Sequence, residues 1–188
     1  MFYRFAPDVH AEWGITDDPS LPESVSFTSG RKISAALTEP LVFAVDVPRG
    51  ARPDHLLGGQ IPVVSDLLLQ TLGAAGVRNV QTFPAVLRNR RTRQKWTGFH
   101  ALNVLGMVDA VNLRASTYDT LMEGSDELPP LLVFTRLVFA RSKGPELPLF
   151  RLPQSPTTMI MSEGVREALL RRSPEGGWGI TAEEIRVK

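Results

Sequence analysis

The sequence predicts an α+β fold in which a mostly antiparallel sheet of seven or more strands is joined by two short capped helices. Most apolar runs are short, rich in β-branched and aromatic residues, and bounded by Pro, Gly or Asp, which is typical of strands. Two of these runs end at a Ser that is followed by an acidic residue and a helix-like stretch. A basic segment separates two long β-like runs, and this arrangement indicates a hairpin.

The expected strands follow one another along the chain with turn residues between them. The clearest are LVFAVDV at 41–47, which ends at Pro48-Arg49-Gly50, and LLVFTRLVFAR at 131–141. Pro84 has no backbone N–H to donate and therefore predicts an edge or a bulge in its strand. The main expected strands are 41–47, 77–88, 96–113, 116–122, 131–141, 147–153 and 180–187, with FYRF near the start as a further short edge strand.

The two helices are predicted from their capping residues. Ser65 is a good N-cap, and Asp66 lies favourably at the positive end of the helix dipole. Ser162 is expected to cap a second helix that runs to about Arg172. The side chains expected to face the core are Leu68, Leu69, Leu72, Leu169 and Leu170.

The stretch IPVVSDLLLQTLGAAGVRNVQ at 61–81 is similar to TMIMSEGVREALLRRS near the end of the chain. Each contains an apolar β-prone run, a Ser followed by an acid, a short helical stretch, and then glycine before further β character. Capping chemistry alone produces this likeness, because a strand that turns into a capped helix needs the same residue types each time. We therefore favour one structural device used twice over a duplicated functional module.

Composition limits the classes of protein that the chain can represent. Its 188 residues, 43% of them hydrophobic, are enough for one domain over 1–188 with a sizeable core. The absence of cysteine excludes disulfides and thiolate sites and is consistent with a cytoplasmic protein. The chain has no apolar run of about 18 residues, so no membrane span is expected, and the N-terminal segment lacks the apolar core of a secretory signal. The net charge of +1 argues against a dedicated nucleic-acid binder.

Catalytic chemistry has few candidate residues. The histidines are His10, His55 and His100, and for each of them we favour a structural role over general base catalysis. An enzyme hypothesis nevertheless places Asp54, His55 or His100 with nearby arginines in one pocket. The histidines are too scattered for a metal motif, and no phosphate loop or dinucleotide fingerprint occurs, so neither a metal nor a cofactor is expected.

A basic segment and an acidic segment are the candidate partner surfaces. The acidic tip follows the strand expected at 116–122, and the basic hairpin lies between the strands expected at 77–88 and 96–113. A dense arginine cluster can be a solvated loop, a docking loop for an acidic protein partner, or a nucleic-acid contact, and we rank the three in that order. The candidate residues are Arg88, Arg90, Arg91, Arg93, Lys95 and Trp96 in the hairpin, and Glu123, Asp126 and Glu127 in the tip.

Four motifs follow one another along the chain in a characteristic order. They are VVS at 63–65, VQTFP at 80–84, LNVLGMVDAV at 102–111 and MSEGVREAL at 161–169, followed by GI. This ordered set resembles a bacterial immunity protein family of polymorphic toxin systems. The resemblance covers roughly 60–187, so 61–188 is the family-like core and 1–60 a variable N-terminal part. It implies a cytoplasmic antidote that binds and neutralises a cognate toxin domain, and the family supplies no catalytic motif to transfer.

Three hypotheses of function therefore stand at this point. The first is a non-catalytic immunity protein that binds a toxin domain. The second is an enzyme that uses His55 or His100, and the third is a nucleic-acid-binding module that uses the basic hairpin at 88–95. Exposed edge strands also leave a homodimer open.

Overall fold

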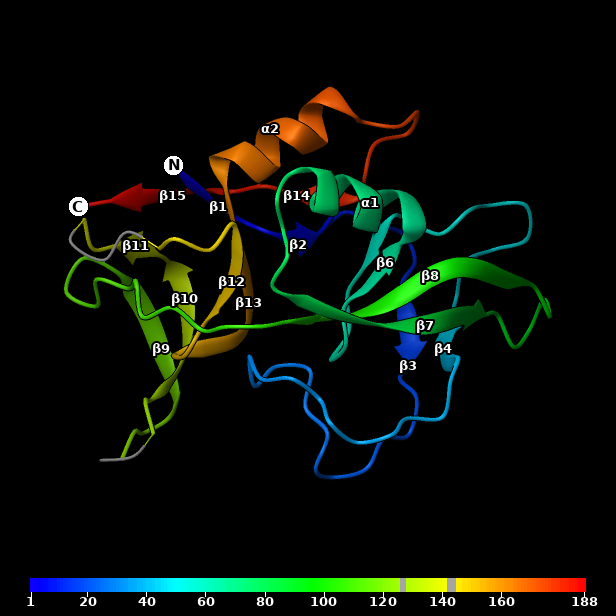
Figure 1. Ribbon diagram of the computed structural model, residues 1–188, viewed down its shortest axis with the longest axis horizontal. Coiled ribbons are helices and arrows are strands. Elements are labelled where there is room, and N and C mark those ends of the chain that lie inside the picture. The colour runs from blue at the N-terminus through cyan, green and yellow to red at the C-terminus, as the bar shows by residue number, and fades with distance from the viewer. Residues whose placement is uncertain (126–127, 142–144) are drawn as a thin grey trace.

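The computed structural model describes residues 1–125, 128–141 and 145–188. Two helices, α1 (Asp66–Ala74) and α2 (Glu163–Arg171), lie side by side above a larger number of strands (Figure 1). The strands are divided among several sheets, so the fold is α+β with β-structure predominating.

The larger sheet has six strands in the order β3-β4-β7-β8-β6-β5. Its centre is the long β7–β8 hairpin, whose strands pair antiparallel from Val80 opposite Val104 to Arg88 opposite Lys95. In this sheet β4 runs parallel to β7, whereas the other neighbouring strands are antiparallel. The strands are β3 (Ile15–Asp17), β4 (Leu41–Val45), β5 (Leu56–Leu57), β6 (Val63–Ser65), β7 (Val80–Arg88) and β8 (Lys95–Val104).

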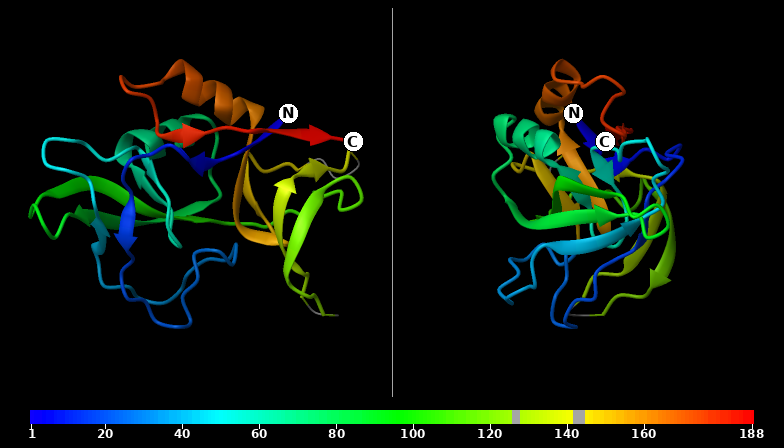
Figure 2. Two further views of the ribbon diagram at one scale, coloured as in Figure 1. Left: turned by 180° about the vertical axis from the view of Figure 1, so that it is seen from behind. Right: turned by 90° about the vertical axis from the view of Figure 1, so that its right-hand side faces the viewer.

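The second sheet joins the two ends of the chain. Its order is β11-β15-β1-β13-β12, so the N-terminal strand β1 lies between β13 and the C-terminal strand β15 (Figure 2). The strands are β1 (Phe2–Arg4), β11 (Val138–Phe139), β12 (Leu149–Leu152), β13 (Ser155–Ser162) and β15 (Glu184–Val187). Two smaller pairs complete the fold, β9 (Thr117–Met122) with β10 (Leu131–Arg136), and β2 (Ala6–Pro7) with β14 (Ile180–Thr181).

The expected strands are found, but they do not form one sheet. FYRF was expected to be an edge strand, and it forms the inner strand β1, paired with β13 and β15. The run expected at 96–113 ends as a strand at Val104, and the chain then crosses toward the second sheet. At the crossing Gly106 has a φ of +98°, and a Cβ there would lie 2.8 Å from Leu147. The positive φ is what favours glycine here, because the contacting Cδ1 of Leu147 is the end of a flexible side chain. Pairing is mostly antiparallel, with β4–β7 and β11–β15 parallel among the described strands.

Pro84 lies in β7, which is an inner strand and not the predicted edge. The pairing of β7 with β4 begins at Ala85, one residue after the proline, so no ladder bond to β4 is lost. The predicted irregularity is present as a shift of register toward β8 between Ala85 and Leu87.

Both helices follow the same local design. Ser65 and Ser162 are the N-caps, with φ and ψ of −74° and 160° in the first and −73° and 162° in the second. The Oγ of Ser65 accepts the backbone N–H of Leu68 at 3.2 Å, whereas Ser162 makes no side-chain capping bond with any described residue. The likeness of the two segments is thus that of two strand-to-helix turns, one of them capped more completely.

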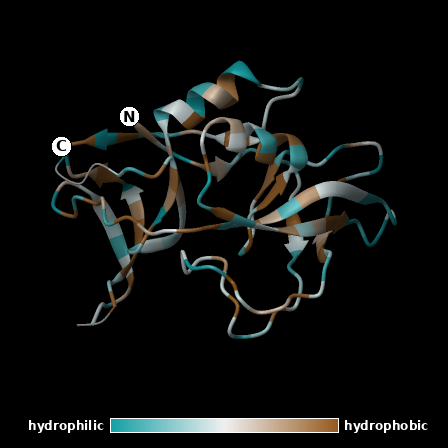
Figure 3. Ribbon diagram, in the orientation of Figure 1, coloured by the Kyte–Doolittle hydropathy of each residue, from teal (hydrophilic) through white to brown (hydrophobic). Residues whose placement is uncertain are grey.

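A shared hydrophobic core lies beneath the two helices. Leu68 and Leu72 of α1 meet Val165 and Leu169 of α2 in this core, together with Tyr3 and other residues from both large sheets. Leu170, which was expected to face inward, is 60% exposed instead. The reason is that it lies about 100° around the helix from the buried Leu169. Two further cores fill the ends of the molecule, and Figure 3 shows brown stretches along the strands between white and teal ones.

The difference between the caps generates the first prediction. Replacing Ser65 with Ala removes a hydroxyl that caps α1, so we expect the free energy of unfolding to fall by about 1–2 kcal/mol. Ser162→Ala is the matched control and should cost less than about 0.5 kcal/mol, since no capping bond is lost there. Urea unfolding followed by circular dichroism measures both free energies. Equal losses in the two variants would contradict the stronger capping role of Ser65.

Candidate functional site

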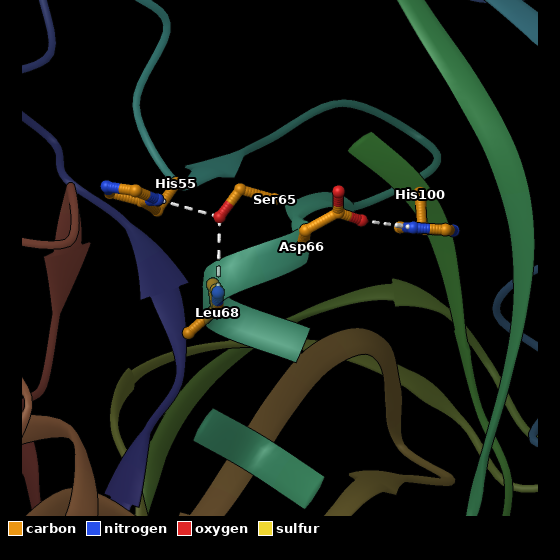
Figure 4. A network of polar contacts seen from close by, with 5 residues as sticks. All are labelled: His55, Ser65, Asp66, Leu68 and His100. Carbon is orange, nitrogen blue, oxygen red and sulfur yellow. Dashed lines mark hydrogen bonds and ion pairs between the residues drawn. The ribbon is translucent and has the colours of Figure 1, made fainter. Parts of the chain in front are cut away.

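Two histidines flank the N-terminus of α1 (Figure 4). The sheet brings them there, because β6, which leads into α1, pairs with β5 on one side and β8 on the other. On the β5 side, the backbone N–H of Ser65 donates to the carbonyl oxygen of His55 at 2.9 Å. On the β8 side, His100 lies opposite Val64. Residues far apart in the sequence therefore meet at one helix terminus.

His55 forms a polar contact with the capping serine. Its Nδ1 lies 2.7 Å from Ser65 Oγ, and the same oxygen accepts the N–H of Leu68. Burial lowers the pKa of His55, and the nearby carboxylate of Asp54 opposes this shift to a smaller extent. A neutral ring without a proton on Nδ1 accepts a hydrogen bond from the serine hydroxyl, and the other tautomer donates its Nδ1–H to the serine oxygen.

His100 and Asp66 form the second contact. Asp66 Oδ1 lies 2.6 Å from His100 Nε2, and the pair is an ion pair whenever the imidazole is protonated. The Asp66 carboxylate also lies at the positive end of the α1 dipole. This contact links β8 to the first turn of the helix and leaves more than half of the Asp66 side chain exposed.

A serine beside a histidine is the arrangement that nucleophilic catalysis requires, but this hydroxyl serves the fold. Ser65 is only 7% exposed, and its oxygen already accepts the N–H of Leu68. The His55 ring packs edge-on against Trp178, with ring centroids 5.1 Å apart. In the described part of the chain, no carboxylate is hydrogen-bonded to the His55 ring to orient it as a base. The geometry is that of a capping network.

The groups of the enzyme hypothesis come together only in part. Asp54, His55, Ser65 and Asp66 line one groove of about 570 Å³ together with Arg52, whereas His100 is not among its lining residues. His10 lies in an exposed turn, where its backbone N–H donates to Asp8. Within 1–125, 128–141 and 145–188, no three His, Asp or Glu side chains are grouped as a metal site would require.

The turn of the basic hairpin is held by hydrogen bonds, and its charged side chains lie at the surface. Asn89 is buried in the turn, accepts the N–H groups of Arg91 and Thr92, and donates to the carbonyl oxygen of Val47. This anchor was not foreseen from the sequence, although Asn is a usual turn residue. The turn is teal in Figure 3. The exposed members of the predicted set are Arg88, Arg90, Arg91, Arg93 and Lys95.

The hairpin is also tied to the N-terminal part of the chain. Arg90 Nη2 donates to Asp17 Oδ2 at 2.7 Å, and Trp96 is half-buried against the core of the six-stranded sheet. The ion pair lies at the surface, where such a contact contributes up to about 1 kcal/mol. Arg91, Arg93 and Lys95 are in no ion pair with another described residue.

The acidic tip is described in part. Glu123 follows β9 and is exposed, while Asp126 and Glu127 lie outside the described residues. All six residues of β9 are exposed, and Leu121 is 72% exposed. The sequence predicted this strand but not its exposure, because Leu121 and Met122 are apolar and gave no sign of facing solvent.

The chain belongs to the Imm11 immunity protein family, whose model matches residues 4–185. The match begins within β1 and therefore includes the N-terminal part, where the quoted motifs do not reach. A search of curated proteins found no match. In the portion of the chain that the structure describes, neither helix is long and apolar enough to cross a membrane.

The half-buried side chain of His55 generates the second prediction. The pKa of His55 is lower in the folded protein than its ordinary value of 6.5, so the unfolded chain binds the proton more readily. The free energy of unfolding should therefore fall as the pH drops below about 6.5. The variant His55→Gln removes this titration and should show a smaller fall between pH 7.5 and 5.5, measured by urea unfolding at each pH. An identical pH dependence in the two proteins would contradict a lowered pKa.

Proposed function

We propose that the protein is a non-catalytic antidote that acts in the cytoplasm by binding a cognate bacterial toxin domain. The observation that carries this proposal is the family match over nearly the whole chain, from residue 4 to residue 185. The polar network at α1 is consistent with it, because its serine and histidines form contacts that hold the helix cap and the sheet. A rigid domain with charged, exposed loops suits protein recognition.

The partner-binding residues suggested by the sequence belong to this proposal. The basic hairpin is the stronger of the two surfaces, since Arg91, Arg93 and Lys95 are exposed on a turn that Asn89 holds in place. Clustered arginine speeds the encounter with an acidic partner surface and aligns the two proteins. In the acidic tip, Glu123 is the described candidate.

The function is tested by co-expression with its toxin. The toxin is sought as a protein with a variable C-terminal domain encoded beside the gene, or as a stoichiometric partner in a pull-down from the native cells. Producing the toxin domain alone should stop growth, and producing this protein with it should restore growth. The two purified proteins should form a stable complex with measurable heat of binding. Continued growth arrest and no complex would overturn the proposal.

The hairpin generates the third prediction. Charge reversal in Arg91→Glu should slow association with the toxin domain by about tenfold, because rim charges act mainly on the association rate. The difference should shrink at high salt as the charges are screened. Arg114→Glu reverses an exposed charge outside the hairpin and is the matched control. Surface plasmon resonance gives both rates, and unchanged association of Arg91→Glu would move the contact away from the hairpin.

A further inference from the structure

Two adjoining grooves run past the loop that follows α2. One, of about 500 Å³, lies between α2 and the N-terminal segment, and its lining includes Trp13, Leu170 and Trp178. The other, of about 570 Å³, is the groove beside His55 described above. Both are lined by Asp54, Gly176 and Gly177, so they meet along one short border. We refer to the two together as the trough.

The border between the grooves is formed partly by two glycines and has no side chains at those positions. Gly176 and Gly177 have φ of +86° and +80°, and a Cβ added at either would meet nothing within 4 Å. Gly179 packs so tightly on Asp54 that its Cβ would lie 2.5 Å from that of the aspartate, which positions the loop. Without side chains at 176 and 177, an extended polypeptide can pass from one groove into the other.

The trough gathers all three tryptophans of the chain. Trp13 and Trp178 line the first groove, and Trp96, at the base of the basic hairpin, lines the second. Trp178 is only 7% exposed, and its indole N–H donates to the carbonyl oxygen of Leu169 at 2.8 Å, so it forms the fixed floor of the first groove. Leu170 and Leu67 add exposed apolar surface to the two grooves. Rigid aromatic side chains in a concave surface are typical anchors of protein interfaces.

The charge of the trough is negative although the whole chain carries +1. Burial raises the pKa of Asp54, and the carboxylate of Asp8 raises it further, which shows that these negative charges act on one another. The guanidinium of Arg166 is drawn over the ring of Tyr3, 4.7 Å from its centroid. Of the described lining residues, five are carboxylates and two are arginines, namely Asp8, Glu12, Asp54, Asp66 and Glu175 against Arg52 and Arg166.

We propose that the trough receives an extended, positively charged segment of the toxin domain, with apolar side chains of that segment seated against Trp13 and Leu170. This inference rests on the proposed function and names the surface that performs it. Charge complementarity selects the occupant, because lysine or arginine side chains would relieve the repulsion among the carboxylates. The basic hairpin lies at one end of the trough, where Trp96 joins the two surfaces.

The test compares matched substitutions on two exposed surfaces. Leu170→Lys and Glu12→Lys alter the trough, whereas Leu121→Lys and Asp119→Lys make matching changes in β9, outside the proposed partner-binding residues. All four side chains are exposed, so the variants should fold, as circular dichroism and thermal unfolding can verify. Isothermal titration with the purified toxin domain should give a Kd raised about tenfold or more by each trough substitution. The β9 substitutions should change it by less than about twofold.

Tryptophan fluorescence supplies a second readout. Every tryptophan of the chain lines the trough, so adding a toxin domain should shift or quench the emission of this protein. If the toxin domain used has no tryptophan, all of the measured tryptophan emission comes from this protein. Affinity should also weaken as salt is raised, and less steeply for Glu12→Lys because one charge pair is missing.

The outcomes separate this inference from the function on which it rests. If the toxin domain does not bind the unaltered protein and is not neutralised by it, the proposed function fails. If the toxin domain binds, and binds the trough variants as tightly as the unaltered protein, the proposed function stands and the proposed binding role of the trough is overturned. Loss of affinity confined to Leu121→Lys and Asp119→Lys would likewise overturn the proposed binding role of the trough in favour of β9.

Discussion

The core beneath α1 and α2 is the constraint on which the rest of the structure depends. It draws residues from the N-terminal strand, from both helices and from the loop that ends at Trp178, and so joins segments from every third of the chain. A short helix of nine residues is marginal by itself in water. Each helix is therefore stable because its buried face lies on this core, and each sheet is held in place by the helix that follows one of its strands.

One hydroxyl group illustrates how closely packing and polar chemistry are connected here. Ser65 ends β6, caps α1 and contacts the ring of His55, which in turn packs on Trp178. The α1 terminus, the β5 strand and the loop after α2 are coupled through this chain of contacts. The half-buried His55 and a serine whose oxygen already accepts a hydrogen bond hold the helix terminus in place. A surface that is held in place loses less conformational entropy when it binds a partner.

The near-zero net charge conceals a separation of charge over the surface. The turn of the β7–β8 hairpin is basic, and the trough beside it is acidic. The ion pair of Arg90 with Asp17 neutralises one charge of the hairpin and leaves the others exposed. Two oppositely charged surfaces that meet at Trp96 favour one orientation of a partner. A partner bound the other way round would bring like charges together.

Local features of this protein were determined by the sequence alone. The strand-to-helix turns at Ser65 and Ser162, the β7–β8 hairpin and the strand at 117–122 depend on residues close together in the chain, and they were predictable. The motifs that resemble an immunity family are also local, and the family match agrees with them. The predicted pocket of catalytic groups was only partly realised, because the positions of His55 and His100 follow from strand pairing and not from their neighbours.

Only the tertiary structure decided which segments meet and which side chains are covered. The parallel pairing of β4 with β7, the exposure of Leu170 and Leu121, and the gathering of Trp13, Trp96 and Trp178 all depend on contacts between residues distant in sequence. Arg151 is the clearest case. It is 1% exposed, donates to the carbonyl oxygen of Pro156, and has its pKa lowered to about 10 by burial, although its neighbours LPLF-LP indicate no more than a short strand. Local propensity determines the conformation of a segment, whereas burial is set by the other segments that pack on it.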